Sequence, residues 1–231
     1  MNILSMDTAA SVLSVGLTAD KNTWYFEADA GNRHSEILLT SVDTLLKSAK
    51  ISPKDIDIIA CMKGPGSFTG LRIAFAAAKG MSLSTGCKIA AVPTLDCMAY
   101  PYADWRGIVI PTLDAKKRAF FCALFKDGRR VSEDMDAEPH WIAQAVRKID
   151  ADGSLNVLLT GQDAALLAPQ LMNALSNKIS LARDARRGFA RELLALAEAY
   201  IDDAALSAGP VYIRKSDAEL SRAMNDIERT V

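Results

Sequence analysis

The sequence contains few histidines and cysteines, and neither residue type is spaced for metal binding. The two histidines, His34 and His140, stand 106 positions apart, so no HxxxH or HExxH zinc pattern exists. The four cysteines form no CxxC pair, and Cys61 and Cys122 fall within apolar runs. We therefore expect reduced thiols in the core and no metal site. No histidine lies near Ser67 or a cysteine to mark a nucleophile pair, and no catalytic residue is predicted.

The chain also lacks an excess of charge and a long hydrophobic run. With 27 basic and 28 acidic residues its net charge is −1, which creates no overall field for nucleic acid or an anionic membrane. Asp7 interrupts the first apolar run, and no stretch has the roughly 20 apolar residues of a membrane-spanning helix. These absences predict a soluble cytoplasmic protein with no membrane contact, which would hold an RNA mainly through a partner.

Hydrophobic patterning predicts an α/β protein. In the first half we expect strands at residues 1–6, 12–17, 23–28 and 56–62, and helices at residues 35–50 and 68–83. Only Arg72 and Lys79 are charged within residues 68–83. A helix this apolar must be covered on nearly every side, by its own core or by another subunit.

The second half repeats the beginning of the first. Shifted by 107 positions, Ile3 aligns with Ile110 and Asp7 with Asp114, so each half reads strand, aspartate, small residue, second strand and turn. Alternating patterns then predict strands at residues 107–113, 119–125, 155–160 and 179–182, and helices at residues 141–149, 164–175 and 189–201. We predict two related halves, residues 1–104 and 105–231, each a mixed sheet flanked by helices, with a terminal helix at residues 216–231 that docks back.

A glycine-rich loop joins the predicted strand 56–62 to the predicted helix 68–83. Gly64, Gly66, Ser67 and Gly70 stand at the start of that helix, where backbone N–H groups and the helix dipole favour an anion. The loop is neither a Walker A motif nor GxGxxG, because no Gly-Lys-Ser/Thr follows and Thr69 takes the place of the third glycine. Two interpretations stay open: contact with a phosphate, or a tight turn whose glycines permit close packing.

Asp7 and Asp114 end the leading strands of the two predicted halves. In a duplicated fold they would face one cleft and hold a phosphate-bound Mg²⁺ or a water. The alternative for each is an aspartate that caps a turn at the end of a strand. For Asp114, the following residues Lys116, Lys117 and Arg118 are candidate counter-ions.

The loop and helix sequence resembles a known family. The stretch Gly64-Pro65-Gly66-Ser67-Phe68-Thr69-Gly70-Leu71-Arg72-Ile73 matches without a break the GPGSFTGLRI motif of the TsaB (YeaZ) family of bacterial tRNA threonylcarbamoyladenosine biosynthesis proteins. Supporting matches are Asp7-Thr8, Arg33-His34-Ser35-Glu36, Asp114-Ala115 and Val211-Tyr212-Ile213-Arg214. The resemblance implies an actin-like fold of the acetate and sugar kinase, Hsp70 and actin superfamily, which agrees with the repeat.

The resemblance also implies a function. The chain is similar to a non-catalytic paralogue of TsaD, the enzyme that transfers threonylcarbamoyl to N6 of adenosine 37 in ANN-decoding tRNAs. It would bind and stabilise a TsaD-like subunit and form a complex with a TsaE-like ATPase. Where that enzyme carries an HxxxH metal pair, this sequence reads Val92-Pro93-Thr94-Leu95-Asp96. No intrinsic cofactor is therefore expected, although ATP or ADP is a candidate ligand at the complex interface.

The same resemblance places the partner surface on helices 35–50 and 68–83. A TsaD-like subunit and, in the chain alone, a second copy would compete for it. The implied interface residues are Arg33, His34, Leu38, Val42, Phe68, Leu71, Arg72, Phe75, Ala76 and Lys79.

Other functions remain open. Asp7, Asp114 and the glycine loop favour an active nucleotide-dependent kinase or acyl transferase of the same fold. The chain is short for such an enzyme and lacks an adenosine-type glycine motif in its second half. A metalloprotease is disfavoured by the histidine count.

Overall fold

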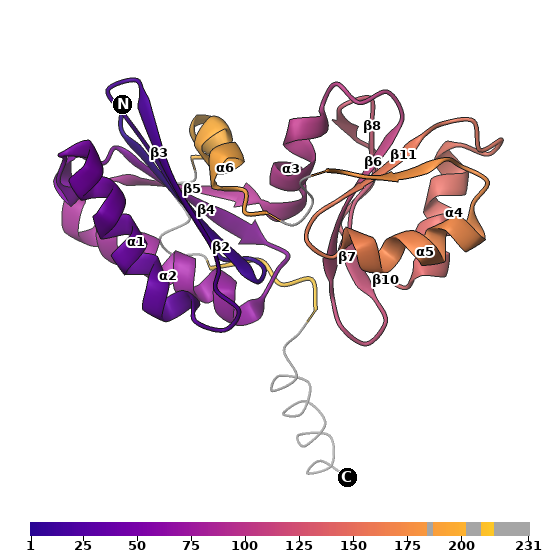
Figure 1. Cartoon of the computed structure of the whole chain (residues 1–231), viewed down its shortest axis with the longest axis horizontal. Coiled ribbons are helices and arrows are strands. Elements are labelled where there is room, and N and C mark those ends of the chain that lie inside the picture. The colour runs from indigo at the N-terminus through magenta and orange to yellow at the C-terminus, as the bar shows by residue number, and fades with distance from the viewer. Residues whose placement is uncertain (184–186, 202–208, 215–231) are drawn as a thin grey trace, which may run out of the picture.

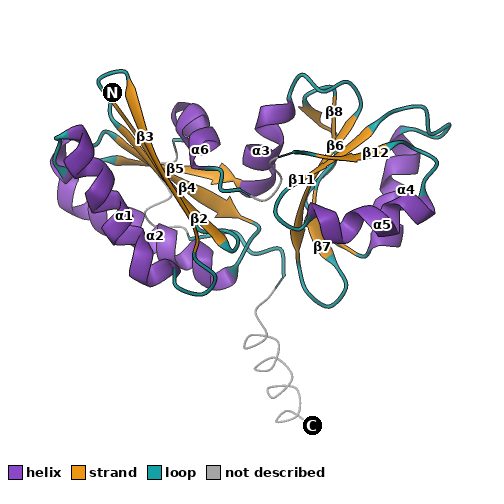
Figure 2. Cartoon of the chain, in the orientation of Figure 1, coloured by secondary structure: helices purple, strands orange, loops and turns teal. Residues whose placement is uncertain are grey.

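The computed structural model describes residues 1–183, 187–201 and 209–214, and in these residues two β-sheets stand side by side (Figures 1 and 2). The helix expected at residues 216–231 lies outside the described residues.

The first sheet has the strand order β3-β2-β1-β4-β5. β1 to β3 form an antiparallel meander, while β4 and β5 run parallel to β1. Helices α1 and α2 cover one face of this sheet. The bounds are β1 (Ile3–Asp7), β2 (Val12–Ala19), β3 (Asn22–Asp29), α1 (His34–Ala49), a 3₁₀ turn (Pro53–Asp55), β4 (Ile58–Gly64), α2 (Phe68–Thr85) and β5 (Lys88–Pro93).

The second sheet repeats this order as β10-β7-β6-β11-β12, with the hairpin β8–β9 beside β6. Its leading strand β6 pairs antiparallel with the next strand and parallel with β11, as β1 does with β2 and β4. The prediction of an α/β protein with two related halves is therefore confirmed. The bounds are β6 (Ile108–Asp114), β7 (Phe120–Cys122), β8 (Phe125–Lys126), β9 (Arg129–Arg130), β10 (Met135–Ala137), α4 (Pro139–Ile149), β11 (Val157–Thr160), α5 (Ala164–Ala174) and β12 (Ile179–Leu181).

Two helices, α3 (Thr94–Ala99) and α6 (Ala190–Leu196), lie between the two sheets (Figure 1). Their buried side chains join one core that takes residues from both sheets, such as Ile58 of β4, Val109 of β6 and Leu193 of α6. Successive side chains of β4 point to opposite faces of the sheet: Ile58 faces this shared core, whereas Ile59 faces α1 and α2. The two halves are thus packed on a common hydrophobic centre.

The chain returns to the first sheet near its end. Helix α6 packs against β1 and β2, and Ile201 forms a bridge with Ala90 of β5. The division at residues 104 and 105 stays a prediction, and the structure adds that residues 187–201 lie on first-half strands.

Some elements differ from expectation. β5 and α3 were not predicted, because the alanines of Lys88–Pro93 weaken the strand pattern and α3 has only six residues. The strand expected at residues 119–125 is divided into β7, which pairs with β10, and β8, which pairs with β9. The helix expected at residues 189–201 ends at Leu196 and tightens into a 3₁₀ turn.

All four cysteines are buried free thiols, as expected. Within the described part of the chain, no helix combines the length and apolarity that crossing a membrane requires.

Replacing Leu193 of α6 with alanine should cost about 2–5 kcal/mol of unfolding free energy, because this fully buried side chain fills the core between the sheets. Leu166→Ala on α5 is the matched control, since Leu166 is 55% exposed and its loss should leave no cavity. Urea denaturation followed by circular dichroism measures both. Equal losses would contradict the shared core.

Candidate functional site

The glycine loop is held against the turn between β1 and β2. The backbone N–H of Ser67 donates to the Ala9 carbonyl at 2.7 Å, and the Ser67 hydroxyl caps α2 by accepting from the Gly70 N–H at 3.2 Å. A Cβ on Gly70 would lie 1.9 Å from the Thr8 carbonyl oxygen, and one on Gly66 would lie 2.9 Å from that of Ala9. These contacts support the close-packing interpretation, and phosphate contact by the loop stays a prediction.

Gly64 packs against a different segment, residues 209–214. Its φ is +117°, and a Cβ there would lie 2.3 Å from the carbonyl oxygen of Val211. The Val211 N–H donates to the carbonyl of Lys63 at 2.7 Å. A glycine is therefore required where the segment 209–214 crosses the end of β4.

Asp7 binds the backbone at the start of α6 and does not line the cleft that separates the two halves. The side chain is 2% exposed, and its two oxygens accept from the backbone N–H groups of Ala9 at 3.0 Å and Phe189 at 2.9 Å. Burial raises the pKa of this carboxyl to about 6, although the two N–H donors lower it. Asp7 does not line the cleft, and its contact with a phosphate stays a prediction.

Asp114 stands at the equivalent end of β6 and does line the cleft. Its oxygens accept from the Nζ of Lys116 at 2.6 Å and from the Lys116 backbone N–H at 2.7 Å, which confirms Lys116 as a counter-ion. Burial disfavours the charged carboxylate, but these Lys116 contacts outweigh it and lower the pKa of Asp114. Lys116, Lys117 and Arg118 all have positive φ, so three consecutive basic residues adopt a left-handed turn at the rim of the cleft.

The cleft between the halves has a volume of about 870 Å³. Its first wall consists of the β1–β2 turn, His34 and the glycine loop, its second of residues 113–117 with Gln162 and Asp163, and residues 211–214 complete it. Gln162 joins the walls, because its Oε1 accepts from the Ser11 hydroxyl at 2.9 Å and from the Val12 N–H at 3.2 Å. His34 is buried and its Nε2 lies 2.8 Å from the Ala10 carbonyl.

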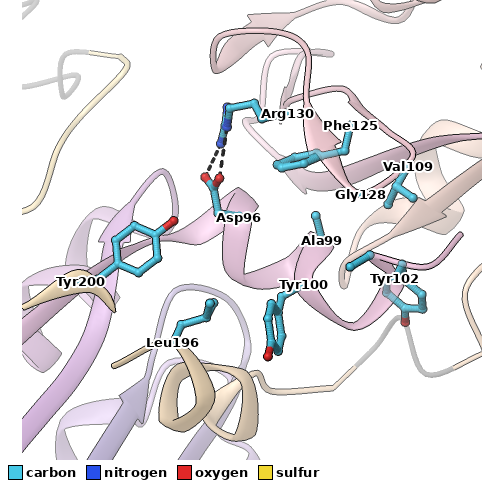
Figure 3. A pocket seen from close by; sticks show the side chains of 11 residues that line it. Asp96, Ala99, Tyr100, Tyr102, Val109, Phe125, Gly128, Arg130, Leu196 and Tyr200 are labelled. Carbon is cyan, nitrogen blue, oxygen red and sulfur yellow. Dashed lines mark hydrogen bonds and ion pairs between the residues drawn. The ribbon is translucent and has the colours of Figure 1, made fainter. Parts of the chain in front are cut away.

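A second cavity of about 180 Å³ lies between α3, the hairpin β8–β9 and the end of α6 (Figure 3). Arg130 forms a bidentate ion pair with Asp96 at its rim and a second pair with Asp134 at 2.8 Å. This pairing ties α3 to the second sheet. No site residue expected from the sequence lines this cavity.

The expected interface residues divide by burial. Arg33, Arg72 and Ala76 are exposed, and Phe68 and Lys79 are half-buried. The other five are buried within the chain: His34, Leu38, Val42, Leu71 and Phe75. The apolar helical spacing of those five therefore marks the inner faces of α1 and α2. The outer faces carry Leu39, 58% exposed, and Leu83, 79% exposed, and neither was among the predicted interface residues.

Two further contacts were also missed. Gln162 gave no signal because a single glutamine in a loop matches no pattern. Residues 211–214 were identified only as a family match, because the sequence does not show that they contact the end of β4 and line the cleft.

In the described ranges 1–183, 187–201 and 209–214, no group of three or more His, Cys, Asp or Glu side chains is placed to hold a metal ion.

Two sheets of the same strand order that face each other across a cleft define an actin-like α/β protein. The solved structure of YeaZ from Pseudomonas aeruginosa covers 92% of this chain and 99% of its own at a TM-score of 0.74 and 22% identity. A Bacteroides thetaiotaomicron protein with an actin-like ATPase fold covers 85% and 95%, at a TM-score of 0.50 and 9% identity. These likenesses confirm the fold.

The family model of TsaD, tRNA N6-adenosine threonylcarbamoyltransferase, matches residues 28–208. The chain therefore belongs to the TsaD family, and the relatives below confirm its resemblance to TsaB and YeaZ. The tRNA threonylcarbamoyladenosine biosynthesis protein TsaB of Bacillus subtilis is 25% identical over 77% of this chain and 78% of its own. Its Escherichia coli namesake is 37% identical over 54% of this chain, and that of Buchnera aphidicola 42% identical over 35%. The matched stretches span only 55% and 37% of those two relatives.

Asp7→Asn should change how stability depends on pH. Because the folded-state pKa of Asp7 is raised to about 6, its stabilising contribution is complete below pH 3.8 and is lost as pH rises through 6. Asparagine does not ionise, so the stability of the variant relative to the parent should rise by up to about 3 kcal/mol between pH 4 and 7. Urea denaturation across this range tests it, with exposed Asp104→Asn as the control. If the difference in unfolding free energy between the variant and the parent does not vary with pH, the raised pKa of Asp7 is contradicted.

Gly70→Ala should destabilise the fold by about 1–3 kcal/mol, because its methyl group overlaps the Thr8 carbonyl. Gly80→Ala in the same helix is the matched control. No atom lies within 4 Å of a Cβ there, so alanine should stabilise the helix by about 0.5–1 kcal/mol. Chemical denaturation measures both, and a loss at position 80 equal to that at position 70 would refute the close-packing interpretation.

Proposed function

We propose that this chain is an accessory, non-catalytic subunit in tRNA threonylcarbamoyladenosine biosynthesis. It binds and stabilises a TsaD-like catalytic paralogue, and a TsaE-like ATPase joins the complex in the cytoplasm. Membership of the TsaD family and similarity to proteins named TsaB support this proposal.

The observation that carries the proposal is the outer surface of α1 and α2. One face of α2 is buried against the first sheet, and the opposite face presents Arg72, Ala76, Gly80 and Leu83 to solvent. Leu83 is 79% exposed, and Leu39 of the adjacent α1 is 58% exposed. Small residues and exposed leucines on the outer faces of two adjacent helices suit close approach by a helix of another subunit.

The same surface serves a second copy when the chain is alone, so homodimer and heterodimer compete. Helix α2 begins at Phe68, which also lines the cleft, so the partner surface and the cleft share one element. ATP or ADP at the complex interface would lie near this junction, and tRNA is held mainly through the complex.

The alternative, an active kinase or acyl transferase, has less support. Such an enzyme would use an aspartate of the leading strand in the cleft. Here both oxygens of Asp7 accept from the N–H groups of Ala9 and Phe189. Asp114 does line the cleft, but both of its oxygens are paired with Lys116. Turnover of a small substrate by the purified chain with ATP and Mg²⁺ would favour this alternative over the accessory role.

Ala76→Glu should weaken binding to the TsaD-like paralogue and to a second copy by about 10-fold or more, because it places an unpaired carboxylate in the apolar contact. Ala165→Glu, an exposed alanine of α5 in the second half, is the matched control and should bind as the parent does. Co-purification measures the first association and analytical ultracentrifugation the second. Unchanged binding by the Ala76 variant in both assays would refute the proposed surface.

A further inference from the structure

Residues 209–214, here named the strap, cross from the first half to the second outside both sheets (Figure 1, yellow segment). No strap residue is buried, and Val211 is 49% exposed. None of the three hydrophobic core clusters contains a strap residue, although the strap forms part of the cleft wall.

The strap contacts the first half through one backbone hydrogen bond and one aromatic anchor. The Val211 N–H donates to the Lys63 carbonyl at 2.7 Å. The Val211 carbonyl packs against Gly64, where a Cβ would not fit. The ring of Tyr212 packs on Phe68, with 4.6 Å between the ring centroids. Its hydroxyl accepts from the Nε of Arg72 at 2.9 Å, and the Arg72 guanidinium stacks 3.8 Å from the Phe68 ring.

Arg214 anchors the strap to the second half. Its guanidinium forms a bidentate pair with Asp136 of β10, with 2.6 Å between Nε and Oδ2, and donates to the Ala115 carbonyl at 2.7 Å. Both side chains are mostly shielded, at 27% and 18% exposure. A bidentate, partly desolvated pair combines strength with geometric selection for arginine over lysine.

We propose that Lys63, Gly64, Phe68, Arg72, Ala115 and Asp136 form a peptide-recognition site, here named the strap groove. Its ligand class is a short peptide with tyrosine and arginine two positions apart, and the strap is its tethered, replaceable occupant. An aromatic anchor, a bidentate arginine and a backbone hydrogen bond are the contacts by which folded domains hold short peptides. Release of the strap removes one wall of the 870 Å³ cleft.

Tethering explains why the strap remains in place with so few contacts. A segment attached to its own binding site is present at an effective concentration in the millimolar range, so even weak contacts stay occupied. A free peptide of the same sequence must compete with that concentration. The groove therefore becomes measurable only after the strap has lost its anchors.

The test uses the full-length chain with Tyr212→Ala and Arg214→Ala together. A labelled peptide Gly-Pro-Val-Tyr-Ile-Arg, which copies residues 209–214, should bind this variant at least 10-fold more tightly than it binds the parent, as measured by fluorescence anisotropy. The same peptide with alanine for its tyrosine and arginine should not bind. Adding Asp136→Asn to the double variant should weaken binding at least 10-fold. Absence of binding to the folded double variant, or equal binding of both peptides, overturns the proposal.

If the double variant does not fold, the strap supports the fold and the proposal is overturned. A second measurement tests the anchoring role of Arg214 in a single variant. Arg214→Asp alone should accelerate hydrogen exchange at the Val211 amide at least 10-fold, while the chain stays folded and its melting temperature falls by only a few degrees. Combining it with Asp136→Arg should restore most of the protection. No acceleration in the single variant would show that Arg214 does not anchor the strap.

Discussion

Helix α6 begins where three consecutive backbone N–H groups meet three side chains of the first sheet. Gly188 donates to Glu27 at 2.8 Å, Phe189 to Asp7 at 2.9 Å and Ala190 to the hydroxyl of Ser14 at 3.0 Å. The start of a helix has unsatisfied N–H groups and a partial positive charge, so two carboxylates suit this place. Helix α6 lies between the two sheets and contributes to their common core. The three hydrogen bonds that fix its first residues to the first sheet therefore help to hold the halves together.

The leading aspartates show what the repeat in the sequence conveyed and what it did not. The shift of 107 positions placed Asp7 and Asp114 correctly at the ends of equivalent strands, and the shared strand order follows from it. Their chemistry diverges because different segments reach them. Asp7 meets the backbone of Phe189, 182 positions away, whereas Asp114 meets Lys116 two positions away. Local partners are visible in a sequence, and distant ones are not.

The two faces of α2 carry the same lesson. Helical spacing predicted the helix and its apolar character, but it did not distinguish Leu71 in the core from Leu83, which is 79% exposed. The glycine loop was found from its residues alone. The reason that glycines are needed there became clear only from the structure: the carbonyl oxygens of Thr8 and Val211 approach positions 70 and 64 from elsewhere in the chain. Close approach by distant backbone leaves no trace in spacing or composition.

The return of residues 187–201 to the first sheet changes how the molecule can bend. The backbone passes from the first half to the second before β6, passes back before α6 and crosses a third time at the strap, which lies outside both sheets (Figure 1). A single crossing would permit rotation about any axis through that point, whereas the two crossings beside the common core leave one axis of easy rotation. The strap, which is anchored to both halves, restrains rotation about that axis. Any opening of the cleft would therefore be a rotation about a line through these two crossings, next to α3 and α6, and would require the strap to release Phe68 or Asp136.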